Sequence, residues 1–92
     1  MNRYGARAME HWQTHRPRAY AAMSDPTGFF TALGEQMAAQ VTTLSLTLAG
    51  DDPGDETFLA KVGRLNMARL QAEEQVIRQM LPPSDQDDKT GE

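Results

Sequence analysis

The sequence predicts a small all-α domain, a three-helix arrangement built on a long antiparallel helical hairpin. Two long segments, residues 26–49 and 53–81, place apolar side chains three and four positions apart, which is the spacing of one helical face. The chain shows neither the alternation of a strand nor an internal repeat. Its 92 residues suit a single domain, placed at 1–81, and a polar, acidic tail at 82–92 that we expect to be disordered.

The first helix is expected over residues 3–16. Pro17 disfavours the helical conformation at the residue before it, so the helix should break there, and a short helical piece should follow over 17–23. We expect this N-terminal segment to close the three-helix arrangement through its aromatic side chains, which are Tyr4, Trp12 and Tyr20.

The clearest amphipathic segment is residues 26–49. Asp25 can cap its N-terminus, and Pro26 suits the first helical position. Gly34 weakens the helix slightly without breaking its period, and Gly50 supplies the stop. The predicted apolar stripe consists of Phe30, Leu33, Met37, Val41, Leu44 and Leu48.

The last helix is expected over residues 53–81. Asp52 is placed to cap a helix that opens at Pro53, and Pro82-Pro83 end it. The short link to the preceding helix predicts that the two form an antiparallel hairpin. The apolar positions of this helix are Phe58, Leu59, Val62, Leu65, Ala72, Val76, Ile77 and Met80.

Composition and charge narrow the class of protein. The chain has no cysteine, and we expect a cytoplasmic protein without disulfides. It contains no apolar run near the ~20 residues of a membrane span and no secretory signal at its N-terminus, so no membrane association is expected. The net charge of −4 is unevenly placed, because residues 24–60 carry six acids and no Lys or Arg, whereas residues 1–23 and 61–81 are basic. The basic segments can pair with the acidic middle, or they can converge on one face and meet an anion.

No group of residues predicts catalysis. His11 and His15 have the four-residue spacing of a zinc pair, but no nearby acid completes a metal-binding motif. The serines lie outside any nucleophile motif, and no glycine-rich loop precedes a helix. Glu73 and Glu74 are adjacent on a helix, so their side chains point about 100° apart and do not face each other. We therefore expect a non-enzymatic protein without metal or cofactor.

Polar side chains interrupt the apolar face of the last helix. Asn66, Arg69 and Glu73 share that face with Val62 and Ile77. They form either an internal network or a contact surface for a partner, and the sequence leaves both interpretations open. Asn66 can also fix helix register, as a single polar residue does in coiled coils.

Gly63 lies within the same helix. A glycine in the middle of a helix costs about 1 kcal/mol relative to alanine, so we expect another backbone to approach closely there.

Several short motifs resemble the TnpV family of transposon-encoded proteins. Near the C-terminus, residues 62–66 (VGRLN), Arg69 and the stretch at 72–76 (AEEQV) are similar to that family's C-terminal motif. Near the N-terminus, Tyr4-Gly5 with Arg7 and His15-Arg16-Pro17 with Tyr20 resemble its YG-x-R and HRP-x-x-Y pieces. The middle of the chain, residues 25–58, matches only as a helix of suitable length. In place of the family's hydrophobic and aromatic end, this chain has Pro82-Pro83 and an acidic tail.

The resemblance implies a cytoplasmic accessory protein of a mobile genetic element, and it implies no catalytic residue because the family has no assigned reaction. The matching residues suggest that the corner at 15–17 packs against the last helix, where Glu73 or Glu74 would pair with Arg16 or Arg7. The candidate interaction surface comprises Arg7, His15, Arg16, Tyr20, Arg64, Asn66, Arg69, Glu73 and Glu74.

Protein–protein interaction with an unidentified partner is the leading functional prediction. One alternative is a DNA- or RNA-binding accessory of transposition or excision, which requires a shared face for Arg3, Arg7, Arg16, Arg18, Arg64 and Arg69. The other is an inhibitor of a host defence nuclease, similar to an anti-CRISPR, because acidic surfaces can occupy nucleic-acid sites. Self-association as a homodimer is compatible with each of these functions.

Overall fold

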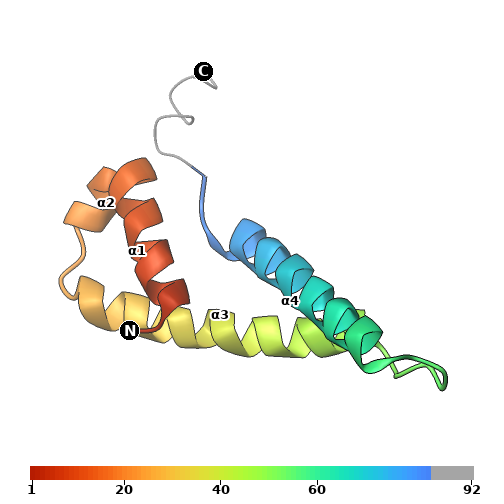
Figure 1. The fold of residues 1–92 in the computed structure, drawn as a ribbon. Coiled ribbons are helices and arrows are strands. Elements are labelled where there is room, and N and C mark those ends of the chain that lie inside the picture. Colours follow the sequence, from red (N-terminus) through yellow and green to blue (C-terminus); the bar gives the residue numbers. More distant parts are fainter. Residues whose placement is uncertain (84–92) are drawn as a thin grey trace.

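The computed structural model describes residues 1–83, and within this range every regular element is an α-helix. In chain order the helices are α1 (Arg3–His15), α2 (Pro17–Ala21), α3 (Pro26–Ala49) and α4 (Phe58–Met80) (Figure 1). The prediction of an all-α fold is confirmed. Of the acidic tail predicted at 82–92, residues 84–92 lie outside the described residues.

Helix α3 is the centre of the arrangement. Figure 1 shows α1 crossing the N-terminal half of α3, while α4 returns antiparallel along its C-terminal half. The helical hairpin and the closing N-terminal helix both follow the sequence prediction. Trp12 and Tyr20 pack against the buried cluster, and Tyr4 belongs to it.

The predicted limits of α3 are confirmed. The Gly28 backbone N–H donates to the Asp25 carboxylate at 3.1 Å, and Pro26 occupies the first turn. Gly50 ends the helix with φ of +66°, a conformation that glycine adopts without steric cost.

The predicted start of α4 at Pro53 is wrong. The helix begins at Phe58, and the Ala60 N–H donates to the Thr57 hydroxyl cap at 3.1 Å. Asp52 does not cap a helix, because its carboxylate pairs with the cations Lys61 and Arg64. The short helix α2 also ends two residues earlier than the predicted residue 23, at Ala21.

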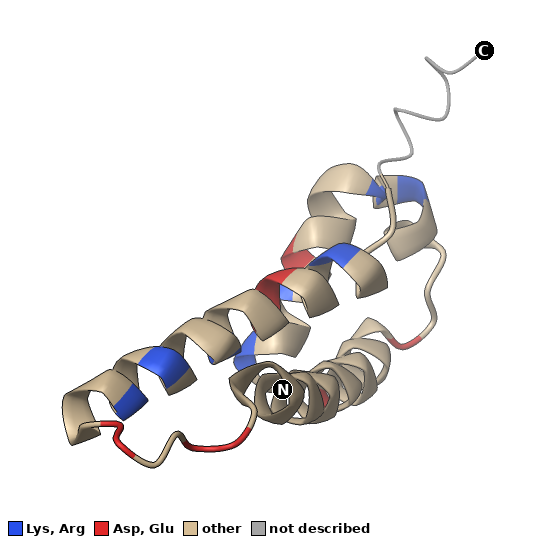
Figure 2. Ribbon diagram, turned by 90° about the vertical axis from the view of Figure 1, so that its right-hand side faces the viewer, with Lys and Arg blue, Asp and Glu red and all other residues tan. Residues whose placement is uncertain are grey.

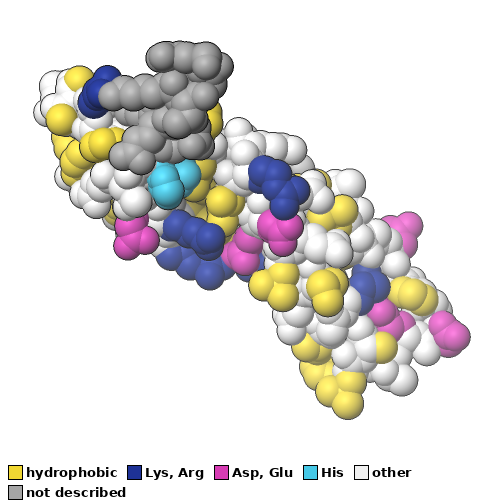
Figure 3. All heavy atoms as spheres, turned by 90° about the horizontal axis from the view of Figure 1, so that it is seen from above, with side chains coloured by type: hydrophobic (Ala, Val, Ile, Leu, Met, Phe, Trp, Pro, Cys, Tyr) yellow, Lys and Arg dark blue, Asp and Glu magenta, His cyan; other side chains and the backbone are white. Residues whose placement is uncertain are grey.

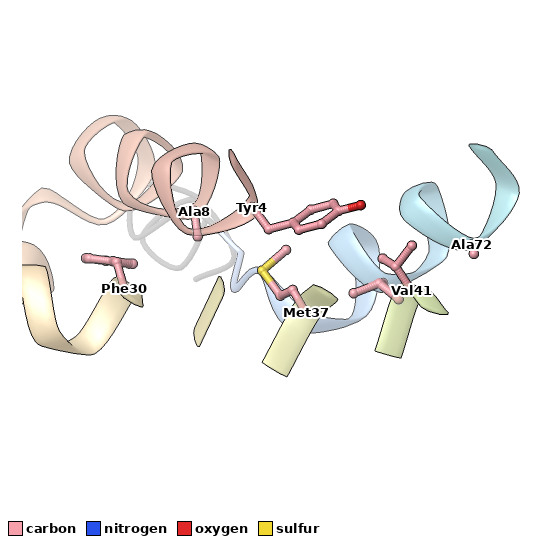
Figure 4. Close-up of a cluster of buried hydrophobic side chains, with 7 residues drawn as sticks. Tyr4, Ala8, Phe30, Met37, Val41 and Ala72 are labelled. Atoms are coloured by element: carbon pink, nitrogen blue, oxygen red, sulfur yellow. The ribbon is translucent and has the colours of Figure 1, made fainter. Parts of the chain in front are cut away.

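The core lies where α1, α3 and α4 meet. Figure 4 shows Tyr4 and Ala8 of α1 above Phe30, Met37 and Val41 of α3, with Ala72 of α4 close by. Phe30 and Met37 are fully buried, and Val41 and Val76 are 1% exposed. The predicted α3 stripe is therefore correct at its buried centre.

Two glycines permit the close crossing of α1 over α3. A Cβ on Gly34 would lie 2.8 Å from the Gly5 Cα, and a Cβ on Gly5 would overlap the Phe30 carbonyl oxygen. The Asn2 side chain secures this crossing, since it accepts from Gly5 N–H at 2.9 Å and donates to Gly34 C=O at 2.9 Å. Gly34 is therefore required for packing, a role that its mild effect on helix propensity did not predict.

Candidate interaction surface

The Glu73 carboxylate is the centre of a polar network between α1 and α4. The Tyr4 hydroxyl donates to it at 2.6 Å, and Arg3 and Arg69 pair with it, the latter at 3.7 Å. Arg69 also donates to the Tyr4 oxygen at 3.3 Å. The Glu73 side chain is 16% exposed, so its hydrogen bonds and ion pairs are partly shielded from water and are stronger than fully exposed ones. The sequence predicted Arg69 and Glu73 as part of a possible network, and the structure adds Tyr4 and Arg3 of α1 to it.

The predicted pairing of Glu73 or Glu74 with Arg16 or Arg7 is wrong. Glu74 instead pairs with Arg78 at 2.8 Å, and both side chains are 71% exposed. The direction of α1 explains the difference, because its N-terminal end meets Glu73 while Arg16 lies roughly 20 Å further along the helix.

The corner between α1 and α2 packs on the start of α3. The Tyr20 ring stacks on Phe30 at 6.1 Å between centroids, and its hydroxyl accepts from Gln13 at 3.1 Å. The Arg16 guanidinium lies over the Trp12 ring at 5.6 Å. Tyr20 therefore packs on α3, and Arg16 packs on Trp12 of α1.

Arg64 holds the loop between α3 and α4. Its guanidinium donates to Glu56 at 2.7 Å, to Asp52 at 2.6 Å and to the Ala49 carbonyl at the end of α3. Figure 2 shows this acidic loop beside the basic start of α4. Arg64 therefore fixes the far end of the hairpin and is turned away from the Glu73 network.

This loop cluster shifts the pKa values of its members. The Lys61 ammonium and then the Arg64 guanidinium hold the pKa of Asp52 below its ordinary value. The hydrogen bonds from Arg64 lower the pKa of Glu56, and the same bonds raise the pKa of Arg64. Both carboxylates therefore favour their charged form in the folded chain.

In the Glu73 network, the Tyr4 hydroxyl contributes most to raising the pKa of Arg3, and the Glu73 charge adds to the effect. Arg3 therefore remains a cation at the N-terminal end of α1.

A cleft of about 450 Å³ separates α1 from the C-terminal end of α4. Its lining includes the cations Arg7 and Arg78, the carboxylate of Glu10 and the apolar side chain of Ile77. The His11 ring nitrogen lies 2.8 Å from the Pro82 carbonyl oxygen. Among residues 1–83, no three His, Cys, Asp or Glu side chains converge as metal ligands would. The cleft brings together Arg7 and His15 of the predicted surface.

The first half of α4 exposes several of the apolar positions predicted for this helix. Leu59 is 80% exposed and Phe58 77%, while Val62 and Leu65 are 37% and 40% exposed. The buried face of α4 is formed by Ala68 and by two of the predicted apolar positions, Ala72 and Val76. Ala68 was not among the predicted apolar positions, although its four-residue spacing before Ala72 was the available signal.

The exposed side chains gather at the hairpin end far from α1. Figure 3 shows yellow side chains at that end of the molecule. We define the exposed α4 face as Leu59, Val62, Gly63, Asn66 and Leu70, of which Leu70 is 61% exposed. Asn66 is therefore surrounded by accessible apolar groups. The predicted interaction surface consisted of polar and aromatic residues, and the structure adds these apolar side chains to it.

Comparisons of this chain with protein-family models, with curated proteins and with solved structures found no match. None of the helices within residues 1–83 has the length and apolar character needed to cross a membrane.

Proposed function

We propose that this chain is a non-enzymatic accessory protein of a mobile genetic element, acting in the cytoplasm by binding another protein. The mobile-element context rests on the sequence resemblance to the TnpV family. The binding role rests on one observation, the exposed α4 face, on which two leucines are each more than half exposed.

Contiguous exposed apolar groups with polar neighbours are typical of protein-binding sites. The side chain of Asn66 takes part in none of the hydrogen bonds within residues 1–83, so it is available to a partner. Arg69, which is 53% exposed, borders the face and links it to the Glu73 network. A partner would bury the leucines and would be oriented by these polar groups.

The distribution of arginines favours a protein partner over nucleic acid. Arg64 is bound to two carboxylates at the hairpin loop, whereas Arg3 and Arg69 pair with Glu73. Three of the six arginines that a nucleic-acid surface would require are thus divided between acids at two separate places. Paired arginines contribute less to phosphate binding, because their charge is already compensated.

An affinity pull-down from host-cell lysate, with and without nuclease treatment, tests the proposal. The double variant Leu59→Asp/Leu70→Asp should lose a protein that the unmodified chain captures in both conditions. Leu46→Asp is the matched control, since Leu46 is a leucine of α3 that is 70% exposed and lies outside the exposed α4 face. Enrichment that disappears after nuclease treatment would instead indicate DNA or RNA binding.

A further inference from the structure

We propose that the exposed α4 face joins two copies of this chain in an antiparallel dimer, with Asn66 of each copy close to the two-fold axis. This inference rests on the proposed function and deepens it, because it names a second copy of the chain as a partner for the same face.

The spacing along the face matches the seam of a coiled coil. Leu59, Val62, Asn66 and Leu70 follow one another at steps of three and four residues, and all four are accessible. The seam from Leu59 to Leu70 is roughly 16 Å long. Residues at this spacing insert into the matching gaps of a second helix, so the face is suited to another helix more than to a flat surface.

Asn66 and Gly63 favour a second copy of α4 as that helix. A carboxamide both donates and accepts, so Asn66 can pair with its own counterpart across a two-fold axis. A single polar residue at a seam position also fixes the register of the pair. Among residues 1–83, a Cβ on Gly63 would have no neighbour within 4 Å, so no backbone in this range makes the predicted close approach. A second α4 would supply that approach.

The position of α1 determines the relative direction of the two helices. Tyr4 of α1 already covers α4 at Glu73, and a cleft bordered by α1 continues at Ile77. A parallel second copy would need this occupied half of α4. An antiparallel copy overlaps only the uncovered half, from Leu59 to Leu70, and therefore fits without displacing α1.

Charge at the two ends of the seam complements this direction. Asp51 and Asp55 lie in the α3–α4 loop, whereas Arg7 lies on the exposed side of α1. None of these three residues forms an ion pair within residues 1–83. An antiparallel pair that sets Leu59 against Leu70 has its axis between Gly63 and Asn66, and it carries the loop before Leu59 past Leu70 of the other copy. Arg7 lines a cleft there with Leu70, Glu73 and Glu74, so the acidic loop of one copy approaches Arg7 of the other at both ends of the seam.

The size of the seam indicates a reversible dimer. Because it spans about three helical turns, we expect it to bury less than the roughly 1,600 Å² of a standard interface. Dissociation in the micromolar range is the corresponding expectation.

Sedimentation velocity over a wide concentration range tests the association. The unmodified chain should change from monomer to dimer as its concentration rises. Leu59→Asp/Leu70→Asp should weaken the dimer by roughly 100-fold or more, because acidic groups would replace the largest buried side chains. Leu46→Asp should leave the dimer unchanged. A monomer at all concentrations, or a dimer that survives the double substitution, would overturn the proposal.

Single cysteines test the geometry, since the natural chain has none. Under oxidation Asn66→Cys should cross-link two copies, because residues beside the axis come within disulfide range. Leu59→Cys should not, because an antiparallel pair places the two Leu59 positions at opposite ends of the seam. Cross-linking of both variants would contradict the antiparallel direction, and cross-linking of neither would overturn the seam.

This cross-linking result remains decisive if the double aspartate variant fails to fold. The failures of the two proposals are also distinguishable. A chain that stays monomeric yet captures a nuclease-resistant protein through Leu59 and Leu70 would retain the proposed function and refute the dimer.

Discussion

The two ends of the helical hairpin differ in how their apolar side chains are covered. At the end that carries α1, Phe30 and Met37 are completely buried. At the loop end, Leu48 is 39% exposed although it lies on the same α3 stripe, and Phe58 is 77% exposed. The helix that covers the first end, α1, begins beside Glu73 and runs away from the second end (Figure 1). An amphipathic helix therefore specifies a face to be covered without specifying how much of it the same chain will cover.

The largest contrast should appear in a pair of phenylalanine substitutions. Phe30→Ala should reduce the free energy of unfolding by about 3–5 kcal/mol, because it leaves a cavity among Trp12, Tyr20 and Phe29. Phe58→Ala, at the uncovered end, should change it by less than about 0.5 kcal/mol. Urea unfolding at a concentration where the chain is monomeric measures both values. Similar losses for the two variants would mean that the loop end is also covered in solution.

Two glycine substitutions should change the free energy of unfolding in opposite directions. Gly34→Ala should destabilise the fold by about 1–3 kcal/mol, since the new methyl group would meet the Gly5 backbone. Gly63→Ala should stabilise the monomer by up to about 1 kcal/mol, because its Cβ enters open space within a helix. Thermal unfolding of dilute samples distinguishes the two, and a destabilised Gly63→Ala monomer would show an intrachain contact at α4.

Hydroxyl removal tests the network that joins α1 to α4. Tyr4→Phe should destabilise the fold by about 1 kcal/mol, because Glu73 loses its 2.6 Å hydrogen bond in a partly buried position. Tyr20→Phe is the matched control and should have a smaller effect, since its hydroxyl only accepts from the exposed Gln13. Chemical unfolding should rank the variants in this order, and equal effects would argue against a special role for the Glu73 network.

The loop cluster predicts the smallest effect, and it depends on pH. Arg64 and Lys61 lower the pKa values of Asp52 and Glu56 in the folded state. Their stabilisation is therefore complete above the ordinary carboxyl pKa, about 4, and is lost as the pH falls through the lower folded values. Arg64→Gln should consequently lose less stability between neutral and acidic pH than the unmodified chain.

Urea midpoints at the two pH values measure this difference. Arg78→Gln, which removes an exposed ion pair on the same helix, serves as the control. An unchanged pH dependence in Arg64→Gln would show that the loop cluster does not contribute to stability.

The candidate surface was only partly predictable. The motifs located Arg69 and Glu73, and the structure places both in one network. They could not indicate Tyr4 as the third member, because helical spacing relates residues within one helix and the direction of α1 relative to α4 is a property of packing. The same limitation led to the incorrect pairing of Glu73 with Arg16 or Arg7.

The sequence by itself determined the all-α class, the hairpin and the limits of α3, because caps, prolines and glycines act through local backbone geometry. Tertiary structure decided which face of α4 is core. That helix has two apolar faces, and the small side chains Ala68 and Ala72 permit close contact with α3 on one of them. The bulkier face with Leu59 and Leu70 then remains outside, because α1 ends its coverage near Glu73.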